Sequence, residues 1–177
     1  MVPTAFGAKV RSTTMNGLKH ALAAIVLVSN FSASVTAGPM EDANAAYRKA
    51  DYATALRLWR PQADQGLALA QSYLGRMYFL GRGVPQDYAE AMKWYRLAAD
   101  QGEARAQASL GLMYDKGFGV QKDHVRAHMW LNLAAAQGDK LSAKYRDAIA
   151  RERMTQAEVA EAQKLAPEWK PTPQPSR

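Results

Sequence analysis

A repeat of 36 residues occupies the middle of this 177-residue chain and restricts the folds open to it. Residues 67–102 align with residues 103–138 without a gap, and 18 of the 36 positions are identical. The same shift carries residues 51–66 onto residues 87–102, so the second half of an earlier copy is also present. Periods of about 20 to 50 residues are typical of chains that stack one supersecondary unit on the next. We therefore expect a solenoid.

The composition indicates that the stacked unit is helical. Alanine is the most frequent residue from Ala43 onward, and valine and isoleucine nearly vanish there. Helix formers thus dominate where strands would need β-branched residues, which predicts an all-α fold. Each copy is expected to form two helices, the first over about residues 67–79 and the second from Asp87, with Glu90 in a capping-box position. Gly102 is expected to end the second helix.

The residues shared by the two copies predict the buried face of each helix. Gly75 recurs as Gly111 inside the first helix, where glycine costs about 1 kcal/mol relative to alanine, so its recurrence indicates close helix approach. At about 100° per residue, the shared positions fall on one arc of each helix. These are Ala68, Ala70, Gln71, Leu74, Gly75, Met77 and Tyr78 in the first helix, and Asp87, Ala91, Trp94, Leu97, Ala98 and Gln101 in the second.

The repeated pattern resembles a known family. It begins Ala-x-Ala-Gln-x-x-Leu-Gly-x-Met-Tyr-x-x-Gly-x-Gly-Val and ends Trp-x-x-x-Ala-Ala-x-Gln-Gly, at residues 68–102 and 104–138. This pattern is similar to the Sel-one-like repeat, a relative of the tetratricopeptide repeat. The resemblance implies an α/α right-handed superhelix of two full repeats and one partial repeat. It also implies a protein-interaction scaffold whose repeats have no catalytic activity of their own.

The residues around the full repeats are expected to form caps and a tail. We expect a capping helix over residues 38–50, the partial repeat over 51–66, two capping helices over 139–167 and a disordered tail over 168–177. Thr155 and Glu158 predict the start of the last helix, which should end before Pro167. Terminal caps are needed because an end repeat would otherwise expose its apolar face.

The first 37 residues have the pattern of a secretory signal peptide. They contain no acidic residue, and from Met15 the short segment Met-Asn-Gly-Leu-Lys-His precedes an apolar stretch at residues 21–28. Small residues follow and end in Val35-Thr36-Ala37, so the mature chain should begin near Gly38. The apolar run is too short to anchor the chain in a membrane. We therefore expect a periplasmic or secreted protein that meets the membrane only during export.

The charge of the mature chain argues against a nucleic-acid partner. Removing Lys9, Arg11 and Lys19 with the signal lowers the net charge from +7 to +4. Basic and acidic residues are interspersed in the remaining sequence, without the basic stripe of a nucleic-acid reader. The expected partner is a protein or peptide.

Residues that could bind a metal are scarce. The chain has no cysteine, and His124 and His128 have the i, i+4 spacing that can place two imidazoles on one ion. No third ligand and no His-Glu-x-x-His pattern accompanies them, so we favour packing roles for both. We expect no metal and no cofactor.

Residues arranged for catalysis are also scarce, so we favour the hypothesis of a non-enzymatic scaffold. No serine or threonine of the mature chain precedes a lysine by three residues, and no carboxylate pair stands in an apolar surround. An exported adaptor of the bacterial envelope is therefore the first hypothesis. The alternative is an envelope enzyme or binder that acts on cell-wall or β-lactam ligands, since some exported cysteine-rich relatives have been linked to that chemistry. The lack of cysteine weakens this alternative.

The positions that differ between the two copies predict the binding surface. On the first helix of each copy they share one arc of about 120°, opposite the buried arc. Tetratricopeptide-like solenoids line their concave surface with this helix, so the resemblance implies that the arc faces a peptide groove. Solvent exposure would also let these positions vary, but several of them are large and apolar, which favours binding. The predicted groove residues are Leu69, Ser72, Tyr73, Arg76, Phe79, Leu80, Arg105, Ala108, Ser109, Leu112, Asp115 and Lys116.

Overall fold

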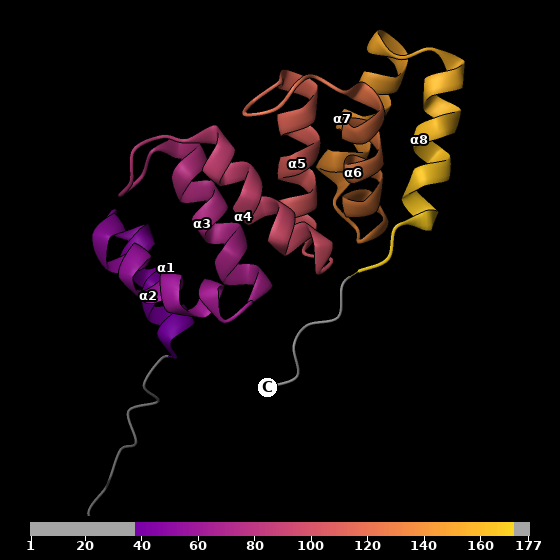
Figure 1. The fold of residues 1–177 in the computed structure, drawn as a ribbon. Helices are drawn as coiled ribbons and strands as arrows, with labels where there is room; N and C mark the ends of the chain where they lie inside the picture. Colours follow the sequence, from indigo (N-terminus) through magenta and orange to yellow (C-terminus); the bar gives the residue numbers. More distant parts are fainter. Residues whose placement is uncertain (1–37, 172–177) are drawn as a thin grey trace, which may run out of the picture. The chain divides into compact units, whose positions relative to one another are not determined.

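The computed structural model describes residues 38–171, which form eight α-helices and no strand (Figure 1). They are α1 (Pro39–Arg48), α2 (Tyr52–Asp64), α3 (Ala68–Leu80), α4 (Tyr88–Asp100), α5 (Ala104–Lys116), α6 (His124–Ala136), α7 (Lys140–Arg153) and α8 (Gln156–Glu168). The predicted signal peptide and part of the predicted tail, residues 172–177, lie outside the described residues. Within 38–171, no helix is both long and apolar enough to span a membrane.

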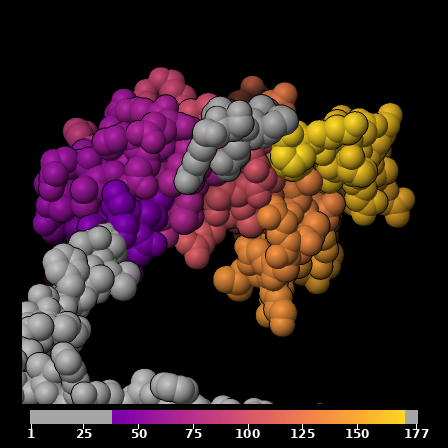
Figure 2. Space-filling view, turned by 90° about the horizontal axis from the view of Figure 1, so that it is seen from below, coloured from indigo at the N-terminus to yellow at the C-terminus, as the bar shows by residue number. Residues whose placement is uncertain are grey.

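The helices stack in chain order. The pairs α1–α2, α3–α4 and α5–α6 each pack together, and α2 and α4 join each pair to the next one. Both α7 and α8 pack against α6 and cover the last repeat. Figure 2 shows the resulting bands, from indigo and purple at the N-terminal helices to yellow at α8. The expected all-α solenoid of two full repeats and one partial repeat with helical caps is confirmed.

The helix ends agree with the predicted capping signals except at the start of α4 and at the end of α8. Asp87 caps α4 by accepting from the backbone N–H groups of Ala89 and Glu90, at 2.9 and 3.0 Å. Its own N–H donates to the Tyr78 carbonyl while the Glu90 side chain pairs with Lys93, so the predicted capping box does not form there.

The capping box does form at the last helix, between Thr155 and Glu158. That helix runs through Pro167 to Glu168, past its predicted end. The fixed φ of proline is compatible with a helix, and in the last turn its missing N–H removes only one hydrogen bond.

The glycines inside the first helices mark close helix approach, as predicted. A Cβ atom added at Gly75 would lie 2.7 Å from the Tyr95 ring, and one added at Gly111 would lie 2.5 Å from Leu131 Cγ. Tyr95 and Leu131 occupy the same position of successive repeats, and Trp59 holds that position in the partial repeat. All three side chains are buried. This position therefore anchors the second helix of every repeat against the first.

The buried face of the second helix is rotated from the predicted one. Trp130 is only 1% exposed, as expected, but Leu97 is 49% exposed and Trp94 is half-buried. Identity between the two copies predicts that Trp94 and Leu97 are buried. The structure instead centres α4 on Tyr95, whose counterpart Leu131 is a different residue, because the facing glycine leaves room for side chains of different shape.

Two buried glutamines join successive helix pairs. Gln71 Nε2 donates to the Ala63 carbonyl at 3.1 Å, and its Oε1 accepts from Gln101 at 2.7 Å. Gln107 repeats this arrangement in the next copy, with the Ala99 carbonyl at 3.3 Å and Gln137 at 2.8 Å. Buried polar groups are rarely left without partners. The recurrence of glutamine in both copies therefore follows from these hydrogen bonds.

Candidate functional site

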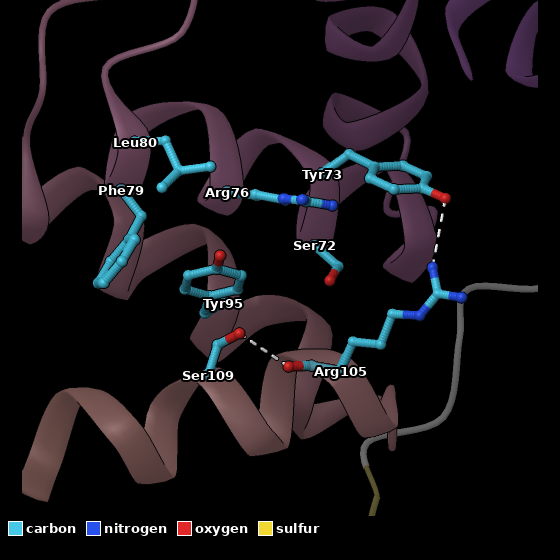
Figure 3. Close-up of a pocket in the computed structure, with 8 residues that line it drawn as sticks. All are labelled: Ser72, Tyr73, Arg76, Phe79, Leu80, Tyr95, Arg105 and Ser109. Atoms are coloured by element: carbon cyan, nitrogen blue, oxygen red, sulfur yellow. Dashed lines mark hydrogen bonds between the residues drawn. The ribbon is translucent and has the colours of Figure 1, made fainter. Parts of the chain in front are cut away.

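A cavity of about 350 Å³ opens between α3, α4 and α5. Figure 3 shows its side chains converging from the three helices. Its lining comprises Ser72, Tyr73, Arg76, Phe79 and Leu80 from α3, Tyr95 from α4, and Arg105 and Ser109 from α5. All of these except Tyr95 belong to the predicted groove. Seven of the twelve predicted groove residues thus line one cavity.

The cavity combines an apolar wall with fixed polar groups. Leu80 is 40% exposed, and Phe79 packs against Tyr88 and Phe118 with ring centroids 5.3 and 5.6 Å apart. Across the cavity, Arg105 Nη1 donates to Tyr73 Oη at 3.4 Å (Figure 3). These groups suit a ligand that offers both aliphatic and hydrogen-bonding atoms.

Tyr95 is the cavity residue that the sequence did not reveal. Burial raises the pKa of its hydroxyl to about 12, against the opposing effect of a hydrogen bond with Ser109. The hydroxyl therefore keeps its proton at neutral pH and can donate a hydrogen bond. The only signal for this residue in the sequence was Gly75, which faces it.

A second cavity of about 460 Å³ adjoins the first and shares Tyr73, Arg76 and Arg105 with it. Its other lining residues are Asn44, Tyr47, Arg48, Ala50, Tyr52, Trp59 and Arg82. We call the two cavities together the groove. The groove is lined by four arginines and by no aspartate or glutamate.

Comparison with known families identifies the repeat. The family model of the Sel1 repeat matches residues 68–103 and 104–139. The chain carries two Sel1 repeats. Proteins built from these repeats generally mediate protein–protein interactions and are typically not enzymes.

Two solved structures support this assignment. A protective antigen present in uropathogenic Escherichia coli strains, which displays an SLR fold, is 28% identical with a TM-score of 0.69. A Sel1 repeat protein from Oxalobacter formigenes is 29% identical with a TM-score of 0.62. The matches cover 74% and 76% of this chain, but only 29% and 55% of those proteins. No curated protein matches the sequence.

Five predicted groove residues lie outside both cavities. Leu69, Ala108 and Leu112 are half-buried on the first helices of the Sel1 repeats, and Lys116 is exposed at the end of α5. Two residues of the predicted exposed arc are buried: Ser72 is 5% exposed, although it lines the first cavity, and Asp115 is only 2% exposed. Asp115 is not a groove residue. It differs from its counterpart Phe79 for a structural reason: it contacts the C-terminal cap, which follows only the second Sel1 repeat.

Asp115 ties α5 to α7. Tyr145 Oη donates to Asp115 Oδ2 at 2.5 Å, Arg153 pairs with Oδ1, and Lys116 Nζ lies 3.1 Å from Oδ2. Burial alone would raise the pKa of the carboxyl group, but hydrogen bonds from Arg153, Tyr145 and Lys116 outweigh it and hold the pKa at about 2. Asp115 is therefore ionised at neutral pH and acts as a structural anchor rather than a groove residue.

The two histidines occupy packing positions. His128 is buried, and burial lowers its pKa. His124 Nε2 lies 3.7 Å from Asp115 Oδ1, at the edge of the same anchor. Within residues 38–171, no group of three or more His, Cys, Asp or Glu side chains could hold a metal ion.

Proposed function

We propose that this chain is an exported scaffold or adaptor that binds a protein or peptide partner in the bacterial envelope through the groove. One observation carries the proposal: residues that differ between the Sel1 repeats gather around a cavity, while shared residues such as Leu74 and Met77 are buried in the core. A repeat scaffold can recognise a particular partner when its core residues are the same in each repeat and the residues of its concave surface differ.

The polar groups of the groove favour binding over catalysis. Its two serines, Ser72 and Ser109, share the lining with no histidine and no carboxylate that could act as a general base. The Ser109 hydroxyl donates to the carbonyl of Arg105 at 2.8 Å. No observation on the described residues favours the alternative of cell-wall or β-lactam chemistry.

Export is the first testable part of the proposal. The pattern that ends at Ala37 predicts a mature N-terminus near Gly38, and α1 begins at Pro39, so cleavage there would leave all eight described helices whole. The intact mass of the protein isolated from a bacterial periplasm should equal that of residues 38–177. Recovery of the uncleaved chain from the cytoplasm alone would contradict export.

The second test addresses the groove. Replacing Leu80 and Arg76 together by serine should abolish the capture of partners by crosslinking in periplasmic extract, because both side chains are exposed on its wall. A matched control replaces Leu97 and Arg57, which are exposed outside the groove, by serine. Both variants should keep the wild-type helical signal. If the groove variant still captures the same proteins as its control, the groove is not the binding surface.

A further inference from the structure

We propose that the groove recognises an acidic segment of its partner, a short extended peptide whose Asp or Glu carboxylates pair with the groove arginines. This inference rests on the proposed function, because it names the partner's chemistry at the same surface. The arginines are Arg48 on α1, Arg76 on α3, Arg82 after α3 and Arg105 on α5. Three of them lie on the first helices of successive helix pairs and Arg82 follows the second of these helices, so an extended chain would cross them in turn.

The four groove arginines have no carboxylate partner. Within residues 38–171, none of them lies within 4.0 Å of an Asp or Glu oxygen. Of the seven other arginines in this range, Arg60, Arg96, Arg126, Arg146 and Arg153 each do, whereas Arg57 and Arg151 do not. Every acidic residue of the chain falls between Glu41 and Glu168, so the remaining segments bring no acidic side chain. Among the described residues, no Asp or Glu side chain therefore forms a direct ion pair with a groove arginine.

Aromatic residues hold three of these arginines in place. Arg82 Nη1 donates to Tyr47 Oη at 2.7 Å, and the guanidinium groups of Arg76 and Arg82 lie 5.4 and 5.6 Å from the Tyr47 ring centroid. Arg105 contacts the Tyr73 hydroxyl. An arginine held in this way loses less conformational freedom when it binds. Its planar donors then remain available for a carboxylate, which can accept two parallel hydrogen bonds.

The arrangement of the rings favours a peptide over a nucleic acid. Single-stranded nucleic acids stack their bases on free aromatic faces. Here Trp59 and Tyr73 stack on each other at 4.4 Å and 14°, and Tyr47 meets Tyr52 edge-on at 5.2 Å. The exposed apolar group beside the arginines is the aliphatic Leu80. We therefore expect acidic residues alternating with aliphatic ones in the bound segment.

A random twelve-residue peptide library displayed on phage and selected on the full-length protein tests this inference. Selected peptides should contain Asp and Glu at least twice as often as the starting library. A fluorescein-labelled selected peptide should bind about tenfold more weakly to an Arg76→Gln, Arg105→Gln variant, and more weakly at higher salt. The control is Arg57→Gln, Arg151→Gln, which removes two exposed charges outside the groove and should bind like wild type.

Several results would overturn the acidic-partner inference. They are the selection of no peptide, no enrichment in acidic residues, and equal affinity of the two arginine variants. Three further results would assign the arginines to another occupant: an oligonucleotide that binds with the same arginine dependence, competition by a synthetic peptide of residues 170–177, and concentration-dependent self-association. If the selected peptides are neutral and fail to bind the Leu80→Ser, Arg76→Ser variant, the acidic-partner inference is wrong but the groove is still the binding surface. This outcome separates a failure of the inference from a failure of the proposed function.

Discussion

Replacing Trp130 with alanine should lower the free energy of unfolding by about 3–5 kcal/mol. Its ring is buried, meets Trp169 edge-on with centroids 5.9 Å apart, and lies 5.2 Å beneath the Arg96 guanidinium. Removing the indole leaves a cavity where the second Sel1 repeat meets the C-terminal segment, and rigid helices on several sides cannot close it. Urea unfolding followed by far-UV circular dichroism measures the loss.

Trp94 provides the matched control because it occupies the same position one repeat earlier. It is only half-buried, with the Arg60 guanidinium 5.3 Å from its ring centroid. Trp94→Ala should therefore destabilise the protein clearly less than Trp130→Ala. Equal losses at the two positions would show that the burial of Trp130 against the cap does not contribute as described.

Asp115→Asn should cost about 2 kcal/mol of stability at pH 7, the value that corresponds to a carboxyl pKa held near 2 instead of its ordinary 3.8. Asparagine keeps the shape of the side chain but removes the charge that Arg153 and Lys116 face. The exposed Asp147, paired with Arg146, gives the control. Because solvent screens that pair, Asp147→Asn should change stability by under about 1 kcal/mol.

The pH dependence of the Asp115 effect has a definite sign. A carboxyl group whose pKa is lower in the folded state stabilises the fold above its unfolded pKa, and this contribution is lost as the pH falls through the folded pKa. The stability difference between wild type and Asp115→Asn should thus be constant above about pH 5 and should shrink between about pH 4 and pH 2. A difference that does not change with pH would mean that Asp115 acts through its shape alone.

Much of the fold could be predicted from the sequence because residues with a specific structural role are identical in the two repeats. Gly75 and Gly111 recur where helices touch, Asp87 recurs as a helix cap, and Gln71 recurs where a buried amide bridges two helix pairs. Each of these roles admits one or two residue types, so identity between copies reveals it. The position of Trp59, Tyr95 and Leu131 requires only bulk opposite its partner helix, and identity between copies therefore missed it.

The candidate site was predicted in part for the same reason. Comparing the two copies reveals every position at which the residue type changes. Ser72, Arg76 and Ser109 are such positions, and all three line the groove. Asp115 differs because α7 covers it, a cap contact that the preceding repeat does not make. Variation between the copies cannot distinguish a groove position from a contact with the cap until the packing of the non-repeated helices is known.

The most direct test of the central claim, that the groove is the binding surface, is amide hydrogen exchange of the full chain with and without its captured partner. A partner bound in the groove should slow exchange over residues 72–80 of α3 and 105–109 of α5, with little change in α6 and α8. Protection confined to α6, α7 or α8, with none over residues 72–80, would contradict it.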